Sequence, residues 1–214
     1  MDEMARTPRR RLGRLQSAGV ITEAATELFL RNGYLGTSMD EIAALAGVSK
    51  QTVYTHFADK ERLFTELVRG NTGPADEFVE VMTGLLDASD DVERDLHDLS
   101  RRYARSVIEP RVLQLRRLVI GEAGRFPELA RAYYERVPER VIASLAGCLG
   151  RLAERGLLRL EDPLLAATHL VALILWTPLD RGMFVADGGV PAAAELDRLA
   201  DAGVDVFLAA YGRA

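Results

Sequence analysis

The 214-residue sequence has little of several residue types: it contains one cysteine, two lysines and 7% aromatic residues. The single cysteine, Cys148, cannot form an internal disulfide bond. Because it lies among leucines, we interpret it as a buried apolar residue rather than a reactive thiol. No segment alternates Val, Ile, Thr or Tyr between hairpin turns, so the sequence predicts essentially no β-sheet. Abundant Ala, Leu and Arg favour helix, and we therefore expect an all-α fold.

Segments that would cross a membrane, or direct export through one, are also lacking. The most apolar run, residues 164–176, is too short to span a bilayer and contains Thr168 and His169. Residues 1–17 are polar and basic, unlike the apolar core of a secretion signal. We expect a cytoplasmic protein with no membrane partner.

The residue patterns of an enzyme are missing as well. We find no nucleophile with a paired base and no Gly-rich phosphate loop. His97 and His169 could ligate zinc, but no cysteine or carboxylate cluster completes a ligand set. We therefore expect no catalytic activity, no metal and no cofactor.

What the sequence does contain is a clear pattern of two short helices joined by a tight turn, over residues 38–57. Ser38 stands three residues before Glu41, which is the spacing of a capping box at the start of a helix. Gly47 permits the left-handed turn that ends this helix, and Ser49 can cap the next one.

The second of these helices, residues 49–57, has one apolar and one polar side. Val53 and Phe57 are expected to pack on the first helix, which buries Ile42 and Leu45. A polar second helix after a short glycine turn is typical of a helix-turn-helix, whose second helix fits the DNA major groove. Side chains at its amino-terminal end are expected to contact base edges, and those on either side to contact phosphates. The predicted DNA-contacting residues are Thr37, Ser38, Ser49, Lys50, Gln51, Thr52, Tyr54, Thr55, His56 and Lys60.

Two more helices complete a small amino-terminal domain. One precedes the pattern and carries an apolar face, and Asp59 caps the one that follows. The apolar residues expected in this core are Val20, Ile21, Ala24, Ala25, Leu28, Phe29, Leu63, Phe64, Leu67 and Val68. A core of this size leaves little apolar surface for a ligand pocket.

The formal net charge of −5 argues at first against a nucleic-acid partner, but the charge is unevenly distributed. Residues 1–70 contain ten basic and nine acidic side chains, whereas residues 71–214 contain 17 and 23. Both lysines, Lys50 and Lys60, lie in the first part. A basic arm there either contacts phosphates or the minor groove, as we expect, or is a tail without a role. It consists of Arg6, Arg9, Arg10, Arg11 and Arg14.

Short motifs within residues 14–70 point to a known family. They are Glu27-Leu28-Phe29, Asn32-Gly33-Tyr34, Thr37-Ser38, Ile42-Ala43, Ala46-Gly47-Val48-Ser49, Val53-Tyr54, His56-Phe57 and Lys60-Glu61-Arg62-Leu63. Together they resemble the DNA-binding domain of the TetR/AcrR repressors. We accordingly predict a basic arm at 1–14, a helix-turn-helix domain at 15–70 and a helical ligand-binding and dimerisation domain at 71–214. Gln51 and Thr55 depart from the family pattern, so the resemblance does not give the operator sequence.

Proline and glycine mark the helix ends of the second part. Five prolines, among them Pro138, fit the first turn of a helix, where a missing amide hydrogen costs nothing. Pro178 lies inside an apolar run and is expected to kink its helix. The predicted helices are residues 74–88, 91–109, 111–124, 127–136, 138–156, 162–184 and 191–211.

Two of these helices have more apolar surface than one subunit readily covers. Helix 138–156 carries a leucine stripe beside Ala146, Gly147 and Gly150, and helix 162–184 is apolar nearly all round. The latter is either the central core helix or meets a second subunit. The family resemblance implies a dimer through the last long helices, and a two-fold operator needs a two-fold protein. We expect a homodimer formed mainly by these two helices.

Aromatic and polar residues of the second part are candidates for an effector pocket. Most such aromatics are ordinary core residues. His97, His169 and Thr177, however, are polar groups in apolar stretches, as in a mostly apolar ligand site with a few orienting groups. The predicted ligand-binding residues, expected to converge in the middle of the domain, are His97, Tyr103, Phe126, Tyr133, His169, Trp176, Thr177, Met183 and Phe184.

The sequence as a whole predicts a DNA-binding transcriptional regulator. We expect a repressor that dimerises on a palindromic operator in double-stranded DNA and is released by a small apolar or aromatic effector. The alternative is a constitutive regulator, or a structural DNA-binding protein, without a small-molecule effector.

Overall fold

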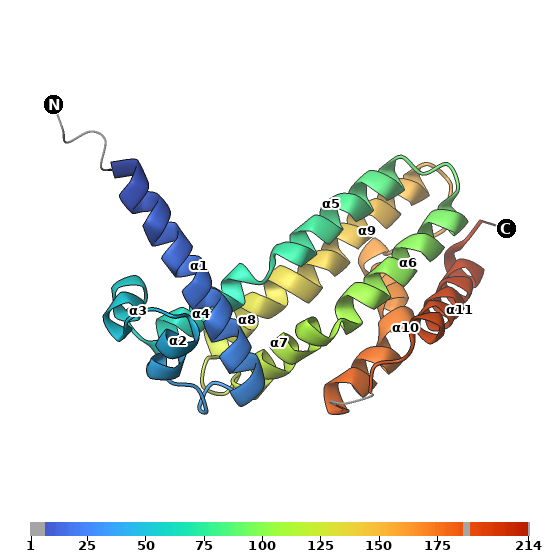
Figure 1. The fold of residues 1–214 in the computed structure, drawn as a ribbon. Coiled ribbons are helices and arrows are strands. Elements are labelled where there is room, and N and C mark those ends of the chain that lie inside the picture. Colours follow the sequence, from blue (N-terminus) through green and yellow to red (C-terminus); the bar gives the residue numbers. More distant parts are fainter. Residues whose placement is uncertain (1–6, 186–188, 214) are drawn as a thin grey trace. The chain divides into compact units, whose positions relative to one another are not determined.

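The computed structural model describes residues 7–185 and 189–213 (Figure 1). Within these ranges the chain forms eleven α-helices and one π-helical segment, and its only β-type pairing is an isolated bridge between Leu158 and Gly212. The predicted all-α fold is confirmed. The helices group into two compact units, one comprising the chain up to Asn71 together with Leu118–Ala130, the other comprising Thr72–Arg117 and the chain from Arg131.

The first unit contains four helices from the amino-terminal part. They are α1 (Thr7–Asn32), α2 (Met39–Leu45), α3 (Lys50–His56) and α4 (Lys60–Gly70). Their core contains the aromatic rings of Phe29, Tyr34 and Phe64, with Phe64 5.3 Å from Phe29 and 5.1 Å from Tyr34, measured between ring centroids. These three side chains join α1, the following loop and α4.

Three details of this unit differ from the sequence predictions. Helix α1 begins at Thr7, so the backbone from Arg9 to Arg14 is helical rather than an arm ahead of the helix, while Arg6 lies outside the described residues. Val20 and Leu45 were expected in the core but are 44% and 47% exposed. Leu45 is the last residue of α2, at the edge of the buried face that includes Ile42, and remains about half exposed.

A segment from the middle of the chain completes the first unit. Residues 118–130 include the end of α7 (Pro110–Gly121) and the start of α8 (Pro127–Tyr134). The ring of Phe126 lies 4.9 Å from Tyr34 and 5.4 Å from Phe64, and Leu129 is buried. Phe126 was predicted to bind ligand in the carboxy-terminal part. The structure instead places it in the aromatic core of the first unit.

The second unit contains the remaining helices. They are α5 (Gly73–Asp87), α6 (Val92–Ile108), the first part of α7, the last part of α8, the π-helical segment Glu135–Glu139, α9 (Arg140–Glu154), α10 (Pro163–Phe184) and α11 (Ala193–Tyr211). Every predicted helix is present, with bounds within three residues of the prediction. Pro138 does not begin a helix, however. It lies in the π-helical segment, whose wider turn accommodates a residue that has no amide hydrogen.

Helix α9 lies in the core of the second unit, packed against α5 and α10. Its stripe Val141, Leu145 and Leu149 is buried, and so is Cys148, whose thiol pKa burial raises, as expected for an unreactive core residue. The predicted dimer stripe on this helix is therefore wrong in one respect: Ala146 is 8% exposed and already covered within the chain.

Helix α10 has two different sides. Its buried side includes Leu170 and Ile174 and packs against α9 and α11, where Gly203 allows a close approach. A Cβ atom at Gly203 would lie 2.8 Å from Ile174 Cγ2. The helix continues through Pro178 to its end, where the carbonyl of Gly182 accepts a hydrogen bond from the Arg117 guanidinium. That bond satisfies one of the carbonyls left free at a helix carboxyl end.

Candidate nucleic-acid interface and effector region

The helix pair α2–α3 is held by the caps that the sequence predicts. Ser38 Oγ accepts from the Glu41 amide at 3.2 Å, and Glu41 Oε2 accepts from the Ser38 amide at 2.8 Å. The hydrogen bond from the Ser38 hydroxyl, followed by that from its amide, lowers the pKa of the Glu41 carboxyl. Gly47 adopts a φ of +65°, and Ser49 Oγ accepts from the Thr52 amide at 3.1 Å. The capping box and the glycine turn are confirmed.

The position of α3 is set by two buried side chains on one of its sides. Val53 is fully buried and Phe57 is 5% exposed, so both pack into the core of the first unit. The opposite side is open to solvent and carries Gln51, Tyr54 and Thr55. A capped helix with a buried apolar side and a free polar side is the element that helix-turn-helix proteins insert into the major groove.

Several of the predicted contact residues have partners within the chain. Lys50 Nζ lies 2.7 Å from Asp40 in an exposed ion pair, which raises the pKa of Lys50 chiefly through its hydrogen bond to that carboxylate. The hydroxyls of Ser49 and Thr52 are 2.8 Å apart. Exposed ion pairs of this kind contribute little to stability, so Lys50 can exchange Asp40 for a phosphate or base at small cost.

Two of the residues predicted to contact phosphates make hydrogen bonds to backbone carbonyls within the chain. Thr37 is 2% exposed and its hydroxyl donates to the Gly33 carbonyl at 2.8 Å. Lys60 Nζ donates to the carbonyls of Tyr34 and Thr37, each at 2.8 Å, and lies 4.4 Å from the centre of the Tyr34 ring. These contacts fix the loop between α1 and α2, on which the position of α2 and α3 depends.

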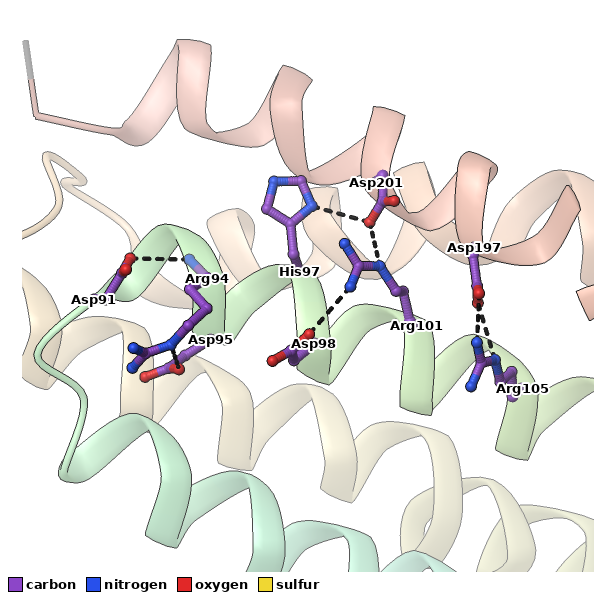
Figure 2. Close-up of polar contacts among 9 residues, drawn as sticks. All are labelled: Asp91, Arg94, Asp95, His97, Asp98, Arg101, Arg105, Asp197 and Asp201. Atoms are coloured by element: carbon purple, nitrogen blue, oxygen red, sulfur yellow. Dashed lines mark hydrogen bonds and ion pairs between the residues drawn. The ribbon is translucent and has the colours of Figure 1, made fainter. Parts of the chain in front are cut away.

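The predicted effector residues do not converge in one pocket. Figure 2 shows His97 in a row of polar contacts between α6 and α11. Arg101 Nε donates to Asp201 Oδ1 at 2.7 Å, His97 Nδ1 lies 3.0 Å from the same oxygen, and Arg105 Nε donates to Asp197 at 2.9 Å. Burial would raise the pKa of Asp201, but the hydrogen bonds from Arg101 and His97 outweigh it and lower the value.

His169 and Trp176 lie instead on an open apolar groove of α10 and α11. The groove has a volume of about 610 Å³ and also includes Leu173, Val206 and Tyr211. Trp176 is 72% exposed, and His169 Nδ1 lies 2.7 Å from the Tyr211 hydroxyl. Near the end of α10, Thr177 and Phe184 are exposed and Met183 is half-buried.

Only Tyr103 and Tyr133 remain as buried polar candidates in the second unit. Tyr103 lies on α6 with its ring stacked on Phe78, 4.8 Å between centroids, and Tyr133 lies near the end of α8. Burial raises the pKa of both tyrosines, and the positive charge of Arg116 on α7 acts in the opposite direction. Arg116 was missed at the sequence level because nothing distinguishes it from the other 24 arginines of the chain.

The described residues contain no group of three or more His, Cys, Asp or Glu side chains arranged to hold a metal ion. Within the part of the chain that the structure describes, one helix, α10, is long and apolar enough to cross a membrane by length and composition. Its packing against α9 and α11, with one side in the core, is what a core helix of a folded domain shows.

Comparison with known proteins places both parts of the chain. Residues 21–67 match the family model described as bacterial regulatory proteins, tetR family, and residues 94–213 match that of the AefR-like transcriptional repressor, C-terminal domain. The uncharacterised HTH-type transcriptional regulator YhgD of Bacillus subtilis is 52% identical over 48 residues. That match covers 22% of this chain and 25% of YhgD, so the chain aligns with about a quarter of this curated relative.

Solved structures match over nearly the whole chain. A putative TetR-family transcriptional regulator from Mesorhizobium loti is 44% identical with a TM-score of 0.86, and the match covers 94% of this chain and 98% of that one. The flavonoid-responsive regulator FrrA is 32% identical with a TM-score of 0.68, covering 92% and 98%.

Proposed function

The chain belongs to the TetR family of transcriptional regulators, and we propose that it is a repressor that binds a palindromic operator as a homodimer. A small apolar or aromatic effector binds the second unit and releases the DNA. The free polar side of α3, a helix held by the Ser49 cap and by its buried apolar side, is the observation that carries the DNA-binding part of the proposal.

We assign the contacts with DNA to the side chains of α3 that are exposed to solvent. Gln51 is exposed at the amino-terminal turn, where recognition helices contact base edges, and its amide can pair with two groups of an adenine. Lys50 joins it after leaving Asp40, and Tyr54 and His56 contact phosphates. Thr37 and Lys60 act from within the fold, by fixing the loop that leads into α2.

The second copy binds at the groove of α10 and α11. Leu173, Trp176 and Val206 are 42%, 72% and 55% exposed there, and large adjoining apolar side chains on a folded unit mark a surface that is covered in the assembly. A second copy suits the surface because two-fold DNA reading requires a two-fold protein. The interface thus uses α10 and α11, not α9 and α10 as the sequence suggested.

Repression and effector control rest on the relatives. The family model that matches residues 94–213 is described as a repressor domain, and FrrA is described as flavonoid-responsive. An effector releases DNA only if it binds more tightly to an arrangement of the dimer that fits the operator poorly.

The test is a footprint of the full-length protein on the promoter DNA beside its own gene. The wild type should protect an inverted repeat, and Gln51→Ala should lose about 1–3 kcal/mol of discrimination between that site and single-base variants of it. Gln114→Ala, which changes an exposed glutamine of α7, is the control and should leave the footprint unchanged. Absence of any sequence-dependent protection by the wild type would contradict the proposal.

A further inference from the structure

Helices α6 and α11 are joined by a row of oppositely charged side chains (Figure 2). Each helix contributes a charged residue at every fourth position, a spacing that places the three residues of each helix on one side. They are His97, Arg101 and Arg105 on α6, and Asp197, Asp201 and Asp205 on α11. Arg105 pairs with Asp197, Arg101 with Asp201, and His97 with both Asp201 and Asp205. Two cationic positions of the row are thus arginines, and the third is a histidine.

Both ring nitrogens of His97 face carboxylate oxygens of α11. Nδ1 lies 3.0 Å from Asp201 Oδ1, and Nε2 lies 3.4 Å from Asp205 Oδ1. A neutral imidazole has one N–H group and can donate to only one of these carboxylates, whereas the protonated ring has two. The side chain of His97 is only 16% exposed, so solvent screens its contacts less than those of an open surface pair. The arrangement fits the protonated ring.

Other charged groups surround His97 in a shallow groove of about 400 Å³. Besides residues of the row, the groove is lined by Asp91, Glu93, Arg94 and Asp98. Arg94 is already paired with Asp90 and Asp95, and the other three are acidic. No further cation among these lining residues is therefore available to replace the charge of His97.

The charge of His97 accordingly decides whether the row is balanced. With the ring protonated, three positive groups face three carboxylates. With the ring neutral, Asp205 loses the cation that faces it and lies one helical turn from Asp201, a spacing at which like charges repel. The attraction between α6 and α11 is thus greater when His97 carries its proton.

We propose that His97 is a pH-sensitive link between α6 and α11, which holds the carboxylates of α11 when protonated and weakens as the pH rises. Imidazole is the side chain that ordinarily changes its charge between about pH 5 and 8, whereas guanidinium groups stay charged. The pairs of Arg101 and Arg105 therefore keep the helices together at any pH in this range, while the His97 link responds to it.

Helix α11 connects this link with the groove that we propose as the contact with a second copy. Asp205 directly precedes Val206, and Val206 and Tyr211 line that groove. A weaker hold on α11 gives this surface more freedom, so the dimer should weaken as the pH rises. This consequence rests on the proposed function, whereas the His97 link itself does not.

Melting temperatures of the wild type and two His97 variants, measured at about pH 5.5 and about pH 8, test the link. His97→Arg is charged at both values, so it should match the wild type at the lower pH and melt about 2–4 °C above it at the higher one. His97→Gln has no charge, so it should melt about 2–4 °C below the wild type at the lower pH, and this deficit should shrink at the higher one. Comparing proteins at one pH cancels the titration of all other groups.

Arg105→Gln is the matched control, because it removes a pair of the same row that keeps its charges in this pH range. Its deficit relative to the wild type should be equal at the two pH values. If the differences between the wild type and the His97 variants are also independent of pH, the inference is overturned. Should His97→Arg fail to fold, the trend of His97→Gln gives the answer alone.

Sedimentation of the wild type and His97→Arg at the same two pH values tests the consequence for the dimer. The dissociation constant of the wild type should rise about five-fold more with pH than that of His97→Arg. An equal pH dependence in the two proteins would contradict the coupling to the dimer. A wild type that is monomeric at both pH values would contradict the proposed function instead, and the melting comparison would still test the His97 link.

Discussion

At the scale of single residues, the two lysines of the chain have different surroundings. Lys60 is half-buried, donates to two backbone carbonyls and lies over the Tyr34 ring, whereas Lys50 is exposed and pairs with Asp40. The ammonium group of Lys60 therefore stabilises the loop after α1, whereas that of Lys50 remains available for a contact with DNA. The sequence located both lysines in the DNA-binding segment but did not distinguish their roles. Lys60 has its role because the loop at residues 33–37 brings the carbonyls of Tyr34 and Thr37 next to its ammonium group.

This difference gives a stability prediction. Lys60→Met should lower the free energy of unfolding by about 1–3 kcal/mol, since it removes charge-assisted hydrogen bonds to the carbonyls of Tyr34 and Thr37. Lys50→Met should leave it almost unchanged. Urea denaturation of the three proteins checks this. If the two variants unfold at the same urea concentration, Lys60 does not fix the loop.

Residue-level prediction succeeded where the chemistry is local. The capping box of Ser38 and Glu41 and the turn at Gly47 need only neighbouring residues to form, so their sequence pattern specifies them. The exposure of a side chain depends also on residues that are distant in the sequence. Leu45 fits the apolar spacing of α2, yet it lies at the end of the helix and the described chain covers only part of it.

At the scale of elements, helix bounds were predictable because caps and prolines set them, but the roles of the helices were not. Helix α9 and helix α10 are both apolar, and only the packing shows that α9 is enclosed by α5 and α10 while α10 keeps an open side. The assignment of segment 118–130 to the first unit depends on contacts between Phe126 and residues far away in sequence. No local pattern encodes such contacts.

Replacement of a glycine by alanine should change the free energy of unfolding in opposite directions at the contact between α10 and α11 and at an open position of α5. Gly203→Ala should cost about 1–3 kcal/mol of unfolding free energy, because the new Cβ would lie 2.8 Å from Ile174 Cγ2 and 3.1 Å from the backbone carbon of Leu173. Gly84→Ala, at an exposed position in the last turn of α5 with no atom within 4 Å of the new Cβ, should instead gain about 0.5–1 kcal/mol.

Thermal or urea unfolding of both variants checks the signs. Stabilisation by Gly203→Ala would mean that α10 and α11 are not packed as closely as the structure shows.

At the scale of the whole molecule, the proposed repression requires two copies that present two α3 helices to one operator. A single capped α3 helix reads only half of a two-fold site, because such a site is read by a two-fold protein. We propose that the groove of α10 and α11 supplies this symmetry, and the sequence predicted this surface only in part. The sequence indicated an apolar α10, while the contribution of Val206 on α11 became evident from its exposure.

Sedimentation of the full-length protein at micromolar concentration, alone and with promoter duplex, tests this central claim most directly. We predict a dimer alone and one dimer per duplex. Val206→Glu should be monomeric, because it buries an unpaired charge in the interface, whereas Val81→Glu, at an exposed valine of α5, should remain dimeric. A wild-type monomer, or a Val206→Glu variant that sediments as the wild type does, would contradict the account.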